Sequence, residues 1–328
     1  MTLTIMKFKP WLALAALLAL PASTPSALAQ SWPAKPVRII VPYGTGGGSD
    51  ILARQLAASL QPMWGQGVVV DNRAGASGNI GTDAVVRSPA DGYTLLLQNS
   101  TMVVNLAVSG KLPYDPEKDL TPIMLLGITP IALFAHPSAN VKTLKDVVDA
   151  AKANPGALTY GSCGNGTPQH FVMELLKQKA GFAAAHAPYK GCAPGLTDVV
   201  GGHVPLAILS ANLGAPYVKS GKLRAIGVAS STRYELMPEV PTFEEQGLKP
   251  LDFSTWFALM GPAKLAPDVV ARITADVQKV LADPQVRSHL SLAGVEPMKG
   301  GAADLSRLIR DDAARYLQLA KSANIKAE

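Results

Sequence analysis

The chain lacks the sequence patterns that mark metal sites, nucleic-acid binding and membrane spans. It has no H-E-x-x-H pattern and no cluster of cysteines and histidines, so we expect no metal site and no cofactor. Its basic residues are scattered, with no run of five or more, which argues against nucleic acid as a partner. Beyond the N-terminal region, no stretch approaches 18 apolar residues without a charge or a breaker, so we expect a soluble mature protein.

The N-terminus carries the three parts of a secretory signal peptide. Lys7 and Lys9 precede the ten-residue apolar run Trp11–Leu20, and Ala27-Leu28-Ala29 then supplies a small-x-small cleavage pattern. The run is too short to span a bilayer, and no cysteine follows it that could carry a lipid anchor. We predict that residues 1–29 are the leader, with cleavage after Ala29 and export to the periplasm. Removing the leader lowers the net charge from +6 to +4 and leaves 299 residues, for which two domains are expected.

The rest of the chain alternates short β-rich runs with helical stretches, which predicts an α/β protein. We expect Ser49 or Asp50 to cap the first helix and Thr143 to open the helix 144–153. Loops rich in Gly, Ser, Thr and Asn follow the carboxyl ends of strands, where ligands bind in open α/β sheets. The expected strands are 37–41, 68–70, 93–97, 128–135, 158–160, 186–188, 204–209, 223–229 and 253–260. The expected helices are 51–60, 82–87, 144–153, 169–180, 195–200, 267–281, 284–293 and 303–322.

The loop from Tyr43 to Asp50 lies between an expected strand and an expected helix and has four glycines in five positions. Glycines let a ligand approach the backbone, and a helix N-terminus favours an anion. A tight turn without a ligand is the simpler explanation, but so many glycines favour a site. A phosphate-binding P-loop would need Gly-Lys-Ser/Thr, and the loop has no lysine. The dinucleotide fingerprint G-x-G-x-x-G fails only at its last position, Ser49, and Asp71 stands where a ribose-binding carboxylate would. An exported Rossmann-like dinucleotide-binding enzyme therefore stays an alternative, although nicotinamide cofactors are chiefly cytoplasmic.

A second loop of the same type runs from Gly161 to Thr167. A nucleophile elbow is absent there, because the residue two before Ser162 is Tyr160 rather than glycine. Cys163 paired with His170 would indicate an enzyme with a catalytic thiolate. In an exported protein, however, a disulfide between Cys163 and Cys192 is the favoured interpretation. That bridge would join two successive strand-end loops. We interpret His170 as a pocket-edge or capping histidine rather than a base.

Several blocks of the sequence are distinctive, and they are spread over essentially the whole mature chain. They are Pro33–Pro42, Asp71–Gly81, Ala90–Leu95, Leu112–Pro116, Tyr160–Ser162, Gly164–Thr167, Tyr189–Gly191, Gly221–Arg224 and Pro238–Thr242. In these blocks the chain resembles the solute receptors of tripartite tricarboxylate transporters, also called Bug receptors.

The resemblance implies a periplasmic-binding-protein-like fold with two α/β lobes and a central ligand cleft. Residues 30–123 plus 225–328 would form lobe 1 and residues 124–224 lobe 2. It also implies a monomeric receptor, not an enzyme, that closes over a small carboxylate (a di- or tricarboxylate or an aromatic acid) and delivers it to membrane permease subunits. A receptor for a sensor kinase is the alternative. The expected ligand-binding residues are Tyr43, Gly44, Thr45, Gly46, Gly47, Gly48, Ser49, Asn99, Ser100, Thr101, Ser162, Cys163, Gly164, Asn165, Gly166, Thr167, His170, Tyr189, Lys190 and Ser210.

The chain departs from the family pattern at three places. Many members have Phe-Pro-Pro before the glycines, whereas Tyr43-Gly44-Thr45 stands here and adds two hydroxyls. Many members have small non-thiol residues where Cys163 and Cys192 stand. Members often place Asp or Asn at the position of Leu209-Ser210, so the absence of an acid here argues against an amino-acid ligand.

Overall fold

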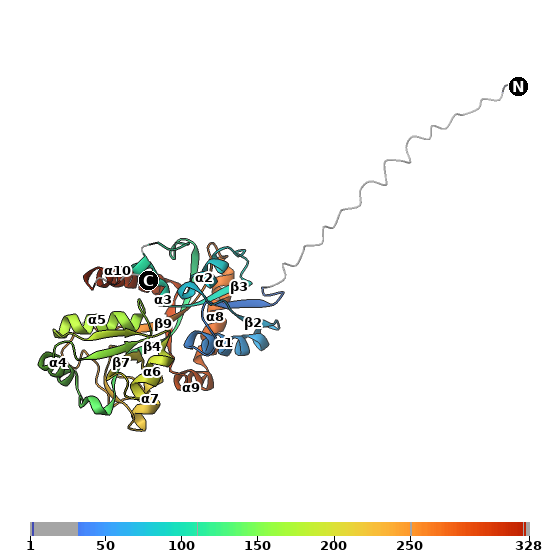
Figure 1. The fold of residues 1–328 in the computed structure, drawn as a ribbon. Helices are drawn as coiled ribbons and strands as arrows, with labels where there is room; N and C mark the ends of the chain where they lie inside the picture. The colour runs from blue at the N-terminus through green and yellow to red at the C-terminus, as the bar shows by residue number, and fades with distance from the viewer. Residues whose placement is uncertain (1, 3–31, 110, 250, 324, 326–328) are drawn as a thin grey trace.

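The computed structural model describes residues 2, 32–109, 111–249, 251–323 and 325. The predicted leader at 1–29, with its cleavage site after Ala29, lies outside the described residues except for Thr2. The described chain is mixed α/β, with two sheet regions that share one long strand (Figure 1).

The first sheet region is built on three parallel strands, with β1 in the middle between β2 and β3. These strands are rich in β-branched and aliphatic residues, and Val37, Ile39 and Val41 of β1 are fully buried. Each strand leads into a helix, so the carboxyl end of each strand is followed by a helix N-terminus. The elements are β1 (Val37–Val41), α1 (Gly48–Trp64), β2 (Val68–Asn72), η1 (Ala76–Gly78), α2 (Asn79–Val86), β3 (Thr94–Asn99) and α3 (Thr101–Ser109).

The second sheet region repeats this arrangement with three further parallel strands, β5 in the middle between β6 and β7. Again the next element after each of these strands is a helix. The elements are η2 (Pro137–Ala139), α4 (Leu144–Ala153), β5 (Thr159–Ser162), α5 (Pro168–Ala180), β6 (Ala185–Pro188), α6 (Cys192–Val200), β7 (Leu206–Ser210) and α7 (Ala211–Lys219).

The long strand β4 (Leu120–Ala135) joins the two regions. Up to Pro130 it pairs antiparallel with β9 (Ser254–Pro262) and with β10 (Glu296–Gly301). From Ile131 it pairs antiparallel with β7 and with β8 (Arg224–Val228). The strand order is β2-β1-β3-β9-β4-β7-β5-β6, with β8 and β10 also paired to β4. The predicted lobe boundaries at 123/124 and 224/225 fall inside β4 and β8, and the division stays a prediction.

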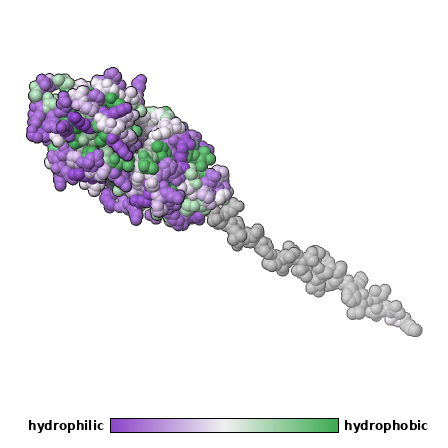
Figure 2. All heavy atoms as spheres, turned by 90° about the horizontal axis from the view of Figure 1, so that it is seen from below, coloured by the Kyte–Doolittle hydropathy of each residue, from purple (hydrophilic) through white to green (hydrophobic). Residues whose placement is uncertain are grey.

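Three helices close the chain: α8 (Pro267–Ala282), α9 (Pro284–Leu292) and α10 (Ala302–Ser322). Helices α8 and α9 pack against α1, whereas α10 packs against α3, β4 and α5. The edge-to-face contact of Phe171 with Tyr316, at 5.2 Å between ring centroids, joins α5 to α10 inside the largest buried cluster. The face in Figure 2 is mostly hydrophilic, interrupted by small hydrophobic patches, because the large apolar side chains are mostly inside.

Most predicted elements are found, with shifted ends. The strand 37–41 and the helix 144–153 have the predicted bounds, and Thr143 caps that helix. The predicted cap of the first helix was wrong: α1 begins at Gly48 with Gly47 as its N-cap, because the Asp50 carboxylate turns back to the Gly46 amide. Helices α3 and α7 and strand β10 were not predicted.

Candidate functional site

The glycine-rich loops of the first sheet region lie at one edge of that sheet. Because β1, β2 and β3 are parallel, their last residues, Val41, Asn72 and Asn99, end at the same edge. The loop before α1, the loop before α2 and the start of α3 therefore converge there, as ligand loops do in open α/β sheets.

The second sheet region has the same construction. Ser162, Pro188 and Ser210 end the parallel strands β5, β6 and β7. The loops that lead into α5 and α6 and the start of α7 therefore meet at the carboxyl edge of this sheet as well.

The two carboxyl edges face each other along β4. Asn99 at the end of β3 lies opposite Phe257, which lies opposite Gly127 of β4. Ser210 at the end of β7 lies opposite Ile131 of β4. Strand β3 runs parallel to β4 and β7 runs antiparallel to it, so the two strand ends point toward one another. The opposed positions Gly127 and Ile131 are four steps apart along β4, which is about 13 Å of extended chain.

Tyr43 ties the first loop to the end of β3. Its hydroxyl lies 2.5 Å from Gln98 Oε1 and 2.9 Å from Asn99 Oδ1, so it donates to one of these two oxygens. Burial raises the pKa of Tyr43, so the phenol stays a donor at neutral pH. Asn99 Nδ2 donates in turn to Ser49 Oγ at 3.3 Å. The Tyr43 hydroxyl thus fixes the loop from within.

Asp50 holds the glycine turn from inside the protein. Its carboxylate is nearly fully buried and accepts hydrogen bonds from Gly46 N at 2.9 Å, Arg54 Nε at 3.0 Å and Asn72 Nδ2 at 3.0 Å. Burial raises the pKa of Asp50, but these three donors outweigh burial and hold the pKa below its usual range. The first amides of α1 have no partner within the helix and are the groups that a helix N-terminus offers to an anion.

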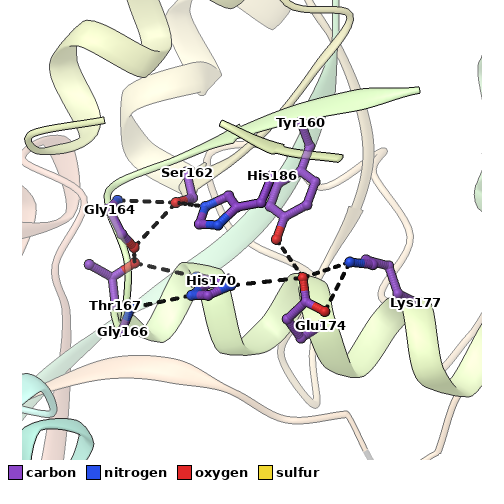
Figure 3. Close-up of polar contacts among 9 residues, drawn as sticks. All are labelled: Tyr160, Ser162, Gly164, Gly166, Thr167, His170, Glu174, Lys177 and His186. Carbon is purple, nitrogen blue, oxygen red and sulfur yellow. Dashed lines mark hydrogen bonds and ion pairs between the residues drawn. The ribbon is translucent and has the colours of Figure 1, made fainter. Parts of the chain in front are cut away.

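The second loop is shaped by hydrogen bonds among its own residues (Figure 3). Ser162 Oγ accepts from Gly164 N at 3.1 Å, and Thr167 Oγ1 donates to Gly164 O at 2.8 Å. Gly164 has a φ of +129°, and a Cβ on it would lie 2.8 Å from Tyr189 O. This position therefore needs glycine for two independent reasons.

Two stacked imidazoles lie beside the second loop (Figure 3). The His186 ring stacks on Tyr160 at 4.8 Å and on His170 at 4.0 Å between ring centroids. His186 Nε2 lies 2.6 Å from Ser162 Oγ, and His170 Nδ1 accepts from Gly166 N at 3.2 Å. Burial, aided by His186, lowers the pKa of His170 to about 4, so this imidazole is neutral at neutral pH.

The predicted disulfide between Cys163 and Cys192 is present. It joins the second loop to the first residue of α6. Beside it, Gly191 N donates to Cys163 O at 3.0 Å and Tyr189 N donates to Ser162 O at 3.3 Å. The two loops are therefore held together by one covalent bond and two backbone hydrogen bonds.

The loop between β6 and α6, residues 189–191, is anchored by Tyr189, whose hydroxyl donates to Asp198 Oδ2 at 2.5 Å. Burial, together with the Asp198 carboxylate, raises the pKa of Tyr189 to about 12. Lys190 is exposed beside it. This lysine is the one cationic side chain among the expected ligand-binding residues.

The expected ligand-binding residues fall into two groups. One comprises Tyr43–Ser49 with Asn99–Thr101, and the other comprises Ser162–Thr167, His170, Tyr189, Lys190 and Ser210. Helix α3 brings the groups near each other, because a Cβ on Gly166 would lie 3.6 Å from Val108. Several members are buried, so they shape the loops rather than offer side chains at a surface: Ser49, Ser100, Ser162, Cys163 and His170.

Several residues that fix these loops were missed by sequence reasoning. His186 was taken only as a strand residue, Gln98 only as the residue after the expected strand 93–97, and Asn72 only as part of the block Asp71–Gly81. Asp71, the candidate ribose ligand of the dinucleotide alternative, pairs with Arg73 at 3.0 Å. Only long-range contacts reveal these roles, and no local pattern marks them.

A pocket of about 500 Å³ lies away from the expected ligand loops. It is lined by residues of β4, β9, β10 and α10, among them Leu125, Trp256, Glu296, Asp311 and Arg315, and by none of the expected ligand residues. Among the described residues, no helix is both long and apolar enough to cross a membrane, and no group of three or more His, Cys, Asp or Glu side chains could hold a metal ion.

Known proteins resemble this chain over most of its length. The model of the tripartite tricarboxylate transporter family receptors matches residues 52–325. Protein BugT of Bordetella pertussis is 34% identical over 300 residues, covering 91% of this chain and 92% of BugT. An R. palustris protein solved with adipate is 32% identical, with a TM-score of 0.81 over 90% of this chain and 99% of that one. MatC from Rhodopseudomonas palustris with bound malate is 27% identical, with a TM-score of 0.76 over 88% of this chain and 99% of MatC.

Proposed function

Because the chain belongs to the tripartite tricarboxylate transporter receptor family, we propose that it is a periplasmic receptor for a small carboxylate. The family is one of solute-binding receptors and not of enzymes, and the predicted α/β binding-protein fold is confirmed by its solved relatives. The proposal is that the two halves close over the ligand and that the loaded receptor delivers it to membrane permease subunits.

The observation that carries the proposal is the pair of carboxyl edges that face each other along β4. Each edge offers helix N-termini, whose free amides favour an anion. Gly47 and Gly191 are the N-caps of α1 and α6 and have no side chain that could occupy those amides. A carboxylate bound there would need no arginine, and the loops Tyr43–Ser49 and Ser162–Thr167 contain none.

Two solved relatives support a dicarboxylate, since one was solved with adipate and the other with malate. We propose a di- or tricarboxylate or an aromatic acid as the ligand of this chain. An amino acid is not proposed, because Leu209-Ser210 stands where members of this family often place an Asp or Asn that would hold a ligand amine.

The remaining parts of the proposal concern export and partners. We propose that residues 1–29 are removed after Ala29, and that the mature receptor is a monomer in the periplasm. Residues 30–123 with 225–328 would be one lobe and 124–224 the other. Uptake of the ligand by cells that carry the permease, with and without the receptor, distinguishes transport from signalling to a sensor kinase.

Isothermal titration calorimetry of the mature protein tests the ligand class. The titrants are adipate, malate, citrate, benzoate and NAD. We expect one-to-one binding of at least one carboxylate and no binding of NAD. Micromolar binding of NAD, or no heat from any carboxylate, would refute the proposal.

A pair of glycine variants places the site. A Cβ on Gly47 would meet no described atom within 4 Å, so Gly47→Ala should fold, but its methyl group would lie at the N-terminus of α1. We expect it to weaken carboxylate binding about ten-fold or more, which equals the loss of one charge-assisted hydrogen bond. The matched control is Gly67→Ala at the opposite edge of the sheet, whose Cβ would lie 3.8 Å from Pro36. Equal effects of the two variants on carboxylate affinity would show that this loop does not form the site.

A further inference from the structure

The stacked pair His170 and His186 contacts the second loop through Ser162 and Gly166. Neither imidazole needs to touch a ligand to make these contacts. His170 lies in the first turn of α5 and is 8% exposed. His186 lies in β6, between the rings of His170 and Tyr160 (Figure 3). Through these rings, the strands beneath the loop are linked to the helix that follows it.

The hydrogen bonds determine the protonation state that the loop requires. Gly166 N donates to His170 Nδ1 at 3.2 Å, so Nδ1 must be without a proton. The proton of the neutral ring is then on Nε2, which lies 3.8 Å from Glu174 Oε1. On the other ring, His186 Nε2 lies 2.6 Å from Ser162 Oγ, and that oxygen accepts from Gly164 N.

Protonation of His170 would place two donors against each other. A proton on Nδ1 would face the Gly166 N–H, which would then lose its acceptor. The charged ring would also lie 4.0 Å from the His186 ring, whose electrostatic effect lowers the pKa of His170 and so disfavours its charged form.

The charged and titratable groups around His170 are few. Glu174 and Lys177 lie on its own helix and pair with each other at 2.8 Å, so the carboxylate is already shared. Tyr160 from β5 donates to the same carboxylate at 2.6 Å. Helix α10 packs on α5 through Tyr316, whose ring contacts Phe171, and β7 contributes the neutral Ser210, which accepts from Gln169.

We propose that His170 and His186 are positioning residues of the second loop, and that the neutral form of His170, by accepting the hydrogen bond from Gly166 N, keeps this loop in its ligand-binding conformation. Carboxylate affinity therefore falls on acidification as His170 gains its proton. The affinity part of this inference rests on the proposed function; the loop geometry does not.

The inference predicts the pH range of the effect. The pKa of His170 is lowered to about 4 by burial and by His186, against an ordinary value of about 6.5. The imidazole is therefore neutral from pH 7 down to about pH 5, and the loop should change only below that. If the protonated form does not bind, affinity falls about two-fold at pH 4 and about four-fold at pH 3.5.

The test compares the wild-type protein with His170→Gln, because a glutamine Oε1 can accept from Gly166 N at every pH. The dissociation constant of the same carboxylate is measured for both from pH 7 to pH 3.5, and each is normalised to its value at pH 7. Titration of the ligand itself cancels in the ratio of the two. We expect the ratio of wild type to variant to rise only below pH 5, to about four-fold at pH 3.5. A flat ratio would overturn the inference. His289→Gln, on the exposed side of α9, is the matched control and should follow the wild-type curve.

An NMR titration without ligand tests the loop separately. The chemical shifts of the His170 ring and the Gly166 amide should change with one common midpoint near pH 4. Different midpoints would contradict the positioning role. His186→Phe keeps a stacking ring and removes the imidazole whose electrostatic effect lowers the pKa of His170, so it should raise the His170 midpoint. An unchanged or lower midpoint would count against the pair. If no carboxylate binds either protein at pH 7, the proposed function fails, and the NMR midpoints still decide the inference.

Discussion

Replacing Cys163 and Cys192 together by alanine should lower the free energy of unfolding by about 3–4 kcal/mol. Alanine is preferred to serine, because Cys163 is 8% exposed and a serine would bury a hydroxyl group there. The bridge closes a separation of 29 residues. For a loop of this length, the loss of chain entropy in the unfolded state corresponds to the stated free energy at 25 °C.

The native loops should survive this change. The backbone bonds from Gly191 N to Cys163 O and from Tyr189 N to Ser162 O do not involve sulfur and remain in the variant. The effect should therefore fall mainly on the unfolded state, and carboxylate affinity should change by less than ten-fold. The loss is a large share of the 5–15 kcal/mol that stabilises a typical domain.

Urea unfolding followed by circular dichroism measures the difference. The chain contains two cysteines, so the wild-type protein in excess reductant is a direct control and should unfold at the same urea concentration as the alanine variant. A difference below about 1 kcal/mol between oxidised protein and variant would refute the entropic argument. Two thiols that react in the untreated native protein would refute the bridge itself.

Two further changes test the first and second loops. Gly164→Ala should lower the free energy of unfolding by about 2 kcal/mol or more, because φ is +129° and the Cβ would lie 2.8 Å from Tyr189 O. The control Gly156→Ala is also at positive φ but would meet no described atom within 4 Å, so it should lower that free energy by only about 1 kcal/mol. Equal losses of stability in thermal unfolding would contradict the contact with Tyr189. Asp50→Asn should lower stability at pH 7 by about 1–3 kcal/mol through the weaker bond to Arg54. Because the folded pKa of Asp50 is lowered, its contribution to the free energy of unfolding is present above about pH 4 and is lost as the pH falls further. The free energies of unfolding of the wild type and the variant should therefore converge in acid. A difference that stays constant with pH would contradict this.

Elements with strong local signals were predicted from sequence alone. The helix Leu144–Ala153 has the predicted bounds, because its capping box is local: Thr143 Oγ1 accepts from Asp146 N at 3.1 Å, and the Asp146 carboxylate accepts from Thr143 N. The strand Val37–Val41 is likewise found as predicted, since a run of β-branched residues followed by proline and glycines leaves little choice.

Long-range pairing decided the elements that were missed or shortened. Strand β4 begins at Leu120, eight residues before the predicted start, although Pro122 and Pro130 argue against a strand there. The strand persists because β9 pairs along it, with a shift of register between Pro122 and Met124. Strand β10, with the sequence EPMKGG, has little β propensity and forms by pairing with β4.

The sequence by itself indicated the loops that we propose bind the ligand, because strand ends, glycine clusters and helix starts are local features. It also favoured the pair Cys163 and Cys192, because export and a lone pair of cysteines point to a disulfide. The tertiary structure alone decided which side chains of these loops contact one another. The parallel pairing of β1 with β3, and of β5 with β6, sets the loops side by side at each edge, and β4 turns the two edges toward each other. The contacts of Tyr43 with Asn99 and of His170 with His186 follow from that pairing. No local sequence pattern predicts them, because each joins residues that are separated along the chain.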